Sequence, residues 1–174
     1  AREVGFACIN MDLIAGLPQD SVEGFRDSLE EVLALRPENI TVHTLAMKKG
    51  SRLMEEGGAL PSSEETGRMV NLSLEALEGA GYRPYYLYRQ KYMSGGLENV
   101  SWCLPGTENH YNIIMMEELQ SVLSLGAGGV TKLVDRSSGR IVRLTNPKYP
   151  HDYLAMSAKV LEQKDEILRF YREV

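Results

Sequence analysis

Two apolar segments separated by one amphipathic segment constrain the fold of the N-terminal part of the chain most strongly. Residues 9–18 and 39–46 are short, rich in aliphatic residues and followed by turn-forming residues, which is typical of buried strands. Between them, five apolar residues recur at the spacing of one helix face: Val22, Phe25, Leu29, Val32 and Leu33. This order predicts a right-handed βαβ unit with two parallel strands.

The helix of this unit has a start signal and a stop signal. Asp20 is placed to cap it, and Glu23 follows three residues later, which is the spacing of a capping box. Arg36-Pro37 ends it, because the residue before a proline disfavours helical conformation.

The rest of the chain predicts a second helix and then a largely antiparallel region. The helix is expected from about Ser63 to Gly79, with Val70, Leu74 and Leu77 as its buried stripe. Four tyrosines between residues 82 and 88 and the segment near residues 99–102 indicate strands, the first of them made irregular by Pro84. Residues 121–135 and 140–144 indicate a hairpin, and a final helix is expected from about Tyr149 to the end. Its packed face is predicted to hold Tyr153, Met156, Val160, Ile167 and Phe170.

Composition and charge exclude several classes of protein. A chain of 174 residues with 43% hydrophobic residues can bury a core, and its net charge of −5 disfavours nucleic acid as the main partner. It has no apolar run of membrane-spanning length and no signal-peptide pattern, so we expect a cytoplasmic protein without a membrane partner. Cys8 and Cys103 are far apart and outside any metal-binding spacing, and we expect reduced, mostly buried thiols.

Asp12 is the residue that a plain core strand would not contain. Alternation places Asn10, Asp12 and Ile14 on one face of the first strand, near its carboxyl end. A carboxylate there can accept hydrogen bonds from ribose hydroxyls while a branched aliphatic side chain packs on a base. The alternative is a structural Asp12 that accepts backbone hydrogen bonds or pairs with an arginine, and spacing alone does not choose between the two.

Two other patterns favour structural roles. The segment Gly126-Ala127-Gly128-Gly129 precedes a strand pattern, so we expect a strand bend or a close backbone approach and not a phosphate-binding loop. His43, His110 and His151 have no metal-binding spacing and are expected to be surface or core residues.

A set of short motifs, taken in order, resembles one enzyme family. The motifs are residues 12–18, residues 36–42, Lys49-Gly50-Ser51, Gly81-Tyr82, Asn99-Val100, Pro105-Gly106, Tyr111-Asn112 and residues 125–128. Their order and rough spacing are similar to the C-terminal region of radical S-adenosylmethionine (SAM) enzymes, specifically the oxygen-independent coproporphyrinogen III oxidase (dehydrogenase) group.

The resemblance implies an α/β fold, α+β overall, made of the last βαβ portion of a partial TIM-like barrel and a mixed, largely antiparallel region with helices. The implied domains are residues 1–60, the C-terminal portion of the radical SAM barrel, and residues 61–174, a family-specific C-terminal domain. Two parallel strands and one crossover helix are too few to close a barrel, so we expect a fragment of a larger enzyme. Its first strand should have an open edge through which it can self-associate.

The resemblance also implies SAM as a cofactor. Asp12 and Ile14 fall on positions that contact the ribose and adenine, and Ala46 falls where strand backbone meets the adenine. The three cysteines at CxxxCxxC spacing that hold a [4Fe-4S] cluster are not in this chain, which therefore contains no implied metal ligand. The chain alone is expected to be inactive, and no catalytic residue is assigned within it.

The implied function is oxidative decarboxylation of two propionates of coproporphyrinogen III to vinyls in haem biosynthesis, with the porphyrinogen as small-molecule partner. Two alternatives stay open: a haem-binding or haem-delivery relative of the same family, and a non-radical α/β nucleotide-binding domain. The tyrosine cluster is a candidate wall for the porphyrinogen, although packed strand aromatics are the simpler interpretation. The candidate propionate-binding residues are Arg83, Arg89, Lys91, Lys132 and Arg143.

Overall fold

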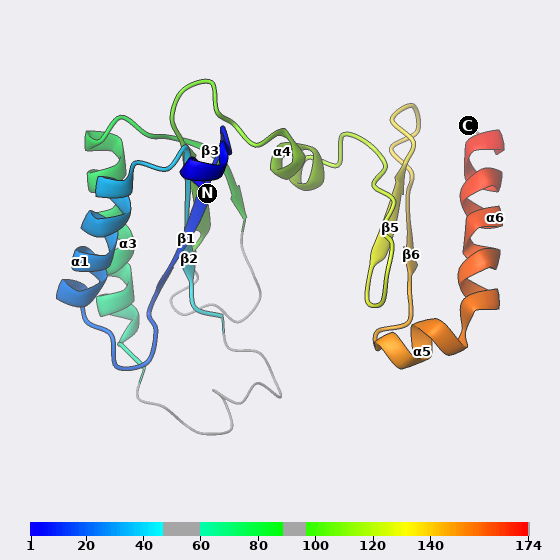
Figure 1. The fold of residues 1–174 in the computed structure, drawn as a ribbon, viewed down its shortest axis with the longest axis horizontal. Helices are drawn as coiled ribbons and strands as arrows, with labels where there is room; N and C mark the ends of the chain where they lie inside the picture. The colour runs from blue at the N-terminus through cyan, green and yellow to red at the C-terminus, as the bar shows by residue number, and fades with distance from the viewer. Residues whose placement is uncertain (47–59, 89–96, 174) are drawn as a thin grey trace. The chain divides into compact units, whose positions relative to one another are not determined.

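The computed structural model describes residues 1–46, 60–88 and 97–173 (Figure 1). The chain forms two compact units, Ala1–Asn109 and His110–Val174. This boundary differs from the predicted division after residue 60, because elements beyond that residue pack with the first strands; the division into a barrel portion and a family-specific region stays a prediction. The motif Lys49-Gly50-Ser51 and the candidates Arg89 and Lys91 lie outside the described residues.

The first unit contains a four-stranded mixed sheet with the strand order β1-β2-β4-β3. Strands β1 (Asn10–Ala15) and β2 (Asn39–Thr44) are parallel. Strand β4 (Asn99–Cys103) is antiparallel both to β2 and to β3 (Arg83–Tyr88). The predicted α/β class, with a parallel pair followed by antiparallel strands, is confirmed. The register of β3 shifts between Pro84 and Tyr86, as expected for a strand that contains a proline.

Two helices cover one face of this sheet. Helix α1 (Val22–Leu35) connects β1 to β2, which completes the predicted βαβ unit, and α3 (Ser63–Gly79) lies beside α1 (Figure 1). A short 3-10 helix, η1 (Arg2–Val4), precedes β1.

The N-caps of α1 and α3 differ from the prediction that Asp20 caps the first helix in a capping box with Glu23. The N-cap of α1 is Ser21, whose hydroxyl accepts a hydrogen bond from the Gly24 N–H at 3.1 Å, whereas Asp20 accepts from the Ser21 N–H. The capping box is found instead at α3, where Ser62 and Glu65 each accept from the other's backbone N–H. Asp20 thus fixes the turn before α1 without capping the helix.

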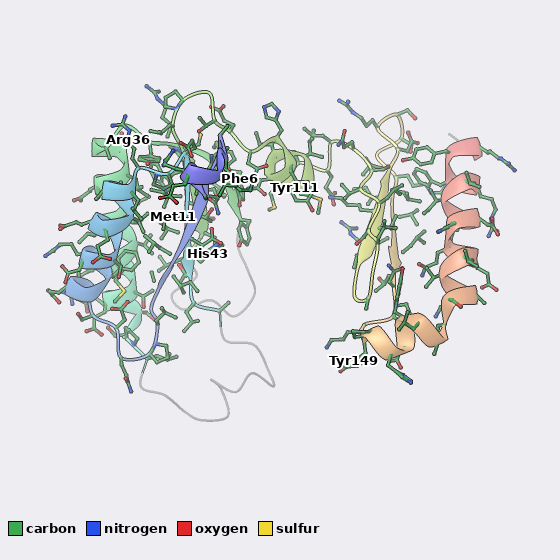
Figure 2. The ribbon with its side chains drawn as sticks, in the orientation of Figure 1. Phe6, Met11, Arg36, His43, Tyr111 and Tyr149 are labelled. Carbon is green, nitrogen blue, oxygen red and sulfur yellow. The ribbon has the colours of Figure 1, made fainter. Side chains whose placement is uncertain are left out.

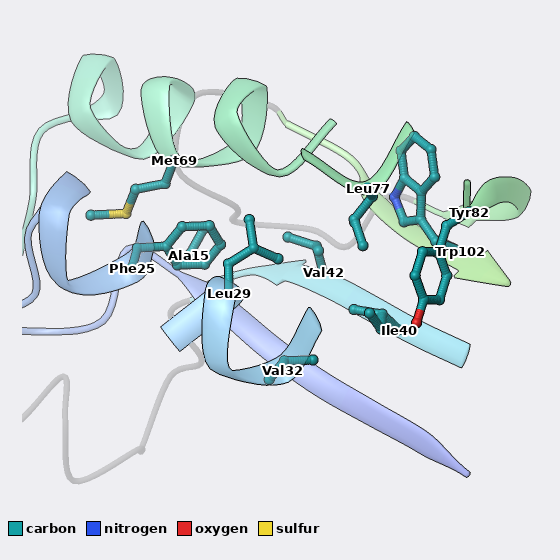
Figure 3. Close-up of a cluster of buried hydrophobic side chains, with 10 residues drawn as sticks. All are labelled: Ala15, Phe25, Leu29, Val32, Ile40, Val42, Met69, Leu77, Tyr82 and Trp102. Atoms are coloured by element: carbon teal, nitrogen blue, oxygen red, sulfur yellow. The ribbon is translucent and has the colours of Figure 1, made fainter. Parts of the chain in front are cut away.

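The core of the first unit lies between the helices and the sheet (Figure 3). Every second strand residue points into it, and both helices contribute apolar side chains. Its buried members are Ala15, Phe25, Leu29, Val32, Ile40, Val42, Met69, Leu77, Tyr82 and Trp102. Each fully buried Leu, Ile, Phe or Met side chain contributes roughly 1.5–3 kcal/mol relative to exposure, so this layer is the main source of the unit's stability. Of the stripe predicted for α3, Leu77 is buried and Val70 and Leu74 are half-buried.

Strand β1 is an edge strand among the described residues. The Asn39 N–H donates to the Ile9 carbonyl and the Leu45 N–H to the Ala15 carbonyl, both at 3.0 Å. Backbone groups of alternate residues point to opposite sides of a strand, so those of residues 10, 12 and 14 point away from β2. The described part of the sheet therefore has the open edge that the sequence predicted.

The second unit is built on a hairpin of β5 (Val130–Val134) and β6 (Ile141–Thr145), as predicted. It also contains α4 (His110–Met116), which the sequence did not predict. The predicted C-terminal helix is two helices, α5 (Pro150–Ala155) and α6 (Ser157–Glu173).

The core of the second unit is small. Leu133, Leu144 and Phe170 are its buried members, and Val142 and Ile167 pack against them. Of the packed face predicted for the last helix, Phe170 is buried, Tyr153, Val160 and Ile167 are half-buried, and Met156 is exposed. The prediction is wrong at Met156, where α5 ends and the single predicted helix is interrupted.

The glycine-rich segment before β5 is a bend, as predicted. Gly126 and Gly128 have φ values of +93° and +71°, which favour glycine. The Asn146 side-chain amide donates to the Gly126 carbonyl at 2.8 Å, and the Gly128 N–H donates to the Pro147 carbonyl at 2.7 Å. These bonds hold the bend against the segment that follows β6.

Asp135 closes the β5–β6 hairpin. Its carboxylate accepts hydrogen bonds from the Ser137 N–H at 2.8 Å and from the hydroxyls of Ser137 and Ser138. The bond from the Ser138 hydroxyl, followed by those from Ser137, lowers the pKa of Asp135 to about 2. The turn is therefore held by the ionised carboxylate.

We predict that amide exchange distinguishes the two sides of β1. The N–H groups of Asn10, Asp12 and Ile14 should exchange on the order of a hundredfold faster than those of Met11 and Leu13, because an unpaired edge amide needs no opening of the sheet. Hydrogen–deuterium exchange by NMR at two protein concentrations measures this. Equal protection of both sets would show that the edge is covered, and protection that rises with concentration would identify a second copy as the cover.

We also predict that the Asp135 turn stabilises the second unit in a pH-dependent way. A carboxyl group with a lowered pKa in the folded state stabilises that state above its unfolded pKa of about 3.9, and loses this effect as the pH falls towards 2. Asp135→Asn should therefore lower the urea midpoint at pH 6 and match the native chain near pH 2. Urea titrations followed by the NMR signals of β5 and β6 test this, with Asp165→Asn on the exposed surface of α6 as control. A deficit independent of pH would contradict a role for the charge.

Candidate functional site

The face of the sheet opposite the helices is polar. Because side chains alternate along each strand, the residues between the core positions point to this face, and Figure 2 labels His43 on this side of the sheet. We call it the polar face and define it by Asn10, Asp12, Ile14, Asn39, Thr41, His43, Tyr86, Tyr88, Asn99 and Ser101. It includes the carboxyl ends of the parallel strands, where ligands bind in α/β proteins.

A line of hydrogen bonds joins three strands across the polar face. The buried Thr41 hydroxyl of β2 lies 2.7 Å from the Ser101 hydroxyl of β4 and donates to the Asn10 side-chain oxygen of β1 at 3.2 Å. The Asn10 side-chain N–H then donates to Asp12 Oδ1 at 2.6 Å. A hydroxyl has one proton, so Ser101 is the donor to Thr41. The line therefore ends on the Asp12 carboxylate.

The Asp12 carboxylate accepts a hydrogen bond at Oδ1, and the rest of the group is accessible to solvent. Its side chain is 56% exposed, and its Oδ2 lies 3.6 Å from His43 Nε2. In the described part of the chain, Asp12 pairs with no arginine. A carboxylate has about four lone-pair positions, so positions remain for hydroxyl donors from a ligand.

His43 lies between Asp12 and Tyr88. Its Nδ1 is 3.1 Å from the Tyr88 hydroxyl, and the two rings meet edge to face with centroids 6.2 Å apart. Tyr88 in turn stacks on Tyr86 at a centroid distance of 6.1 Å. The two ring nitrogens of His43 thus face a carboxylate on β1 and a hydroxyl on β3.

Ile14 and Ala46 lie at the same end of the sheet. Ile14 is opposite His43 in the register of β1 and β2, and its side chain is partly exposed on the polar face. Ala46 follows β2 by two residues and is half-buried. Ile14 and Ala46 thus lie at the carboxyl ends of two neighbouring strands, whereas Asp12, predicted near the end of its strand, lies opposite Thr41 near the middle of β1, because the strand begins only at Asn10. An exposed isoleucine beside a half-exposed carboxylate is a surface on which a base and a hydroxylated sugar can both be bound.

Several residues of this face were missed by reasoning from the sequence. His43 was expected to be a surface or core residue, and Thr41 and Ser101 were not considered. The available signal was the alternation of polar residues at 39, 41 and 43 within an otherwise apolar strand. Asn99 was also missed: it is buried, its side-chain oxygen accepts from the Thr44 N–H at 2.7 Å, and its Nδ2 has no partner among the described residues.

Two candidate cations of the second unit have structural partners. Lys132 is buried and donates to the Met115 carbonyl at 2.9 Å, and its Nζ lies 3.6 Å from the Glu118 carboxylate. Arg143 donates to the same carboxylate at 2.5 Å. Both were candidates for binding propionates, and both are here part of one ion-pair cluster, whereas Arg83 is exposed on β3.

The tyrosines and cysteines separate into core and surface positions. Tyr82 is a core residue whose hydroxyl donates to the Pro37 carbonyl at 2.6 Å, and burial raises its pKa. Cys103 is buried, which raises the pKa of its thiol to about 11, while Cys8 is exposed. The prediction of two reduced thiols matches the free cysteines, but the burial predicted for Cys8 is wrong, because this residue precedes β1 and is exposed.

The described residues contain no helix with the length and apolarity that a bilayer crossing requires. Among the same residues, no three His, Cys, Asp or Glu side chains converge as a metal site would need.

Sequence comparison finds relatives among coproporphyrinogen III oxidase-like proteins and haem chaperones. None of the protein-family models matches the sequence. The chain is 40% identical over its full length to the oxygen-independent coproporphyrinogen-III oxidase-like protein HemZ of Bacillus subtilis and spans 34% of it. It is 23% identical over 96% of its length to the haem chaperone HemW of Escherichia coli, of which it spans 40%. It is 38% identical over 48% of its length to the oxygen-independent coproporphyrinogen III oxidase of Helicobacter pylori strain J99, of which it spans 19%.

A solved structure has the same fold. The structure superimposes on coproporphyrinogen III oxidase (HemN) from Escherichia coli, described as a radical SAM enzyme, with a TM-score of 0.60 and 20% identity. The match covers 85% of this chain and 33% of that one, in its C-terminal region.

The chain thus has the fold of the C-terminal region of a coproporphyrinogen III oxidase. On the sequence matches, the chain belongs to the family of oxygen-independent coproporphyrinogen III oxidase-like proteins, as its motifs predicted. The chain spans from about a fifth to two fifths of the length of these curated relatives.

We predict that the Thr41 hydroxyl stabilises the sheet through the line of hydrogen bonds. Thr41→Val keeps the shape of the side chain but leaves Ser101 and Asn10 without their shared partner, which should lower the free energy of unfolding by about 1–2 kcal/mol. Urea denaturation measures the change. Thr145→Val on the exposed face of β6 is the control and should change the free energy by less than about 0.5 kcal/mol. An equal effect of both substitutions would contradict the role given to Thr41.

Proposed function

We propose that the protein containing this chain is a radical SAM oxidoreductase that oxidatively decarboxylates two propionates of coproporphyrinogen III to vinyls in haem biosynthesis. One observation carries the cofactor assignment: the half-exposed Asp12 carboxylate and the partly exposed Ile14 lie on the same face of β1, with Ile14 towards the carboxyl end of the parallel strands. Family membership supports the reaction, and the porphyrinogen is the proposed small-molecule partner.

The polar face fits the nucleoside part of SAM. Asp12 would accept hydrogen bonds from the ribose hydroxyls, because lone pairs of its carboxylate remain open beside the bond from Asn10. Ile14 would pack on the adenine, and the backbone at Ala46 would bind the adenine edge. Bound together with a [4Fe-4S] cluster, SAM supplies the hydrogen-abstracting chemistry of this enzyme class. The cluster ligands are not in this chain, and we propose that it is inactive alone.

The proposed domain organisation follows from the same family. Residues 1–60 would be the C-terminal portion of the radical SAM barrel, and residues 61–174 the family-specific domain. The parallel β1–α1–β2 unit and the antiparallel strands beyond it support this division.

A second candidate function is haem binding and delivery. It is supported by the match to the haem chaperone HemW, which extends over 96% of this chain. The two functions differ in an observable way: an oxidase converts coproporphyrinogen III under anaerobic conditions, whereas a haem carrier binds haem in an absorbance titration and leaves coproporphyrinogen unchanged.

We predict that Asp12→Ala weakens SAM binding by about ten- to a hundredfold in the complete protein that the gene encodes. The substitution removes a charge-assisted hydrogen bond worth about 1.5–3 kcal/mol, and about 1.4 kcal/mol corresponds to a factor of ten. Calorimetric titration with SAM measures the affinity, and thermal melting shows whether the fold is intact.

Asp27→Ala, on the exposed surface of α1, is the matched control and should leave SAM affinity unchanged. Unchanged SAM affinity of Asp12→Ala together with a large loss of thermal stability would make Asp12 structural and refute the site.

A further inference from the structure

We infer that His43 is a positioning residue: it orients the Asp12 carboxylate for the ribose hydroxyls, and Tyr88 in turn orients His43. This inference rests on the proposed binding of SAM at Asp12. It adds a residue that was expected to have only a surface or core role.

Two polar side chains flank the Asp12 carboxylate. The torsion that rotates an aspartate carboxylate has broad minima, so neighbouring groups must fix its plane. Asn10 donates to Oδ1 at 2.6 Å from the same strand. On the other side, Oδ2 lies 3.6 Å from His43 Nε2, which is longer than a hydrogen bond; a proton on Nε2 would attract the carboxylate across this distance. The carboxylate is therefore held between two polar groups.

Tyr88 holds the His43 ring in place. Its Nδ1 lies 3.1 Å from the Tyr88 hydroxyl, and the edge-to-face contact with the Tyr88 ring restricts its rotation. Tyr88 is itself stacked on Tyr86. This chain of contacts crosses the sheet from β3 to β1, so the orientation of Asp12 depends on a residue more than seventy positions later in the sequence.

The surroundings of the His43 ring favour positioning over direct binding. Its Nδ1 is within hydrogen-bond distance of the Tyr88 hydroxyl, its Nε2 lies beside the Asp12 carboxylate, and the side chain is only 24% exposed. The ring would therefore act on a bound ligand mainly through Asp12. A preorganised carboxylate loses less conformational entropy on binding, and this is how His43 would raise affinity.

The test is a double-mutant cycle on SAM affinity, measured by calorimetry in the complete protein. His43→Phe keeps a ring but removes both nitrogens, and should weaken SAM binding about three- to tenfold, the range expected for one lost polar interaction. In the Asp12→Ala background, His43→Phe should have no further effect, because the group it positions is gone. Equal weakening in both backgrounds would overturn the inference, since it would show a general structural effect or direct contact.

Three other variants keep the test decisive if His43→Phe does not fold. His43→Gln keeps a side-chain N–H donor and should bind SAM more tightly than His43→Phe. Tyr88→Phe removes only the hydroxyl that contacts Nδ1 and should weaken binding about two- to threefold. Tyr171→Phe removes an exposed hydroxyl on α6, outside the polar face, and should leave affinity unchanged. If His43→Phe proves unfolded by thermal melting, the difference between Tyr88→Phe and Tyr171→Phe decides, and no difference overturns the inference.

Failure of the inference is distinguishable from failure of the proposed function. If Asp12→Ala weakens SAM binding while His43→Phe and Tyr88→Phe do not, the inference is wrong and the cofactor site stands. If Asp12→Ala itself has no effect, the cofactor site is wrong and the inference is overturned with it.

Discussion

The parallel register of β1 and β2 is the constraint on which the rest of the first unit depends. With Met11 opposite Ile40 and Leu13 opposite Val42, the apolar residues of both strands face the helices. A slip of β1 by one residue would turn Asp12 into that core and move its apolar side chains to the polar face. Burying an unpaired carboxylate is costly, so the hydrophobic layer itself excludes the wrong register. The same interactions that stabilise the unit therefore determine where its polar groups lie.

The polar face shows how a sheet can be both stable and open to a ligand. Thr41 and Ser101 are buried, but their hydroxyls satisfy each other and connect to β1 through Asn10. The side chains around them are more exposed: His43 is half-buried at the carboxyl end of β2, and Asp12 and Ile14 are exposed on β1. Buried polar groups whose hydrogen bonds are made within the protein thus support exposed polar groups beside them. This is the arrangement expected of a preorganised binding surface.

The sequence was sufficient for features that depend on local periodicity. The helix from Ser63 to Gly79, the βαβ unit and the common face of Asn10, Asp12 and Ile14 all follow from spacing within one segment. The contact between His43 and Tyr88 does not, because it requires β3 to pair with β4 and β4 with β2 across segments distant in sequence. The prediction of the N-cap of α1 failed for a different reason. Asp20 and Ser21 are both favourable N-cap residues, and the conformation of the turn determines which of them caps the helix.

The open edge of β1 has a further consequence for the polar face. Asn10, Asp12 and Ile14 carry both the unpaired backbone groups of that edge and the side chains of the proposed site. Any strand that pairs with β1 would place its own alternate side chains directly beside Asp12, and so would supply the next wall of the site. Strand pairing and ligand binding at Asp12 would then be thermodynamically linked, each strengthening the other by the same factor.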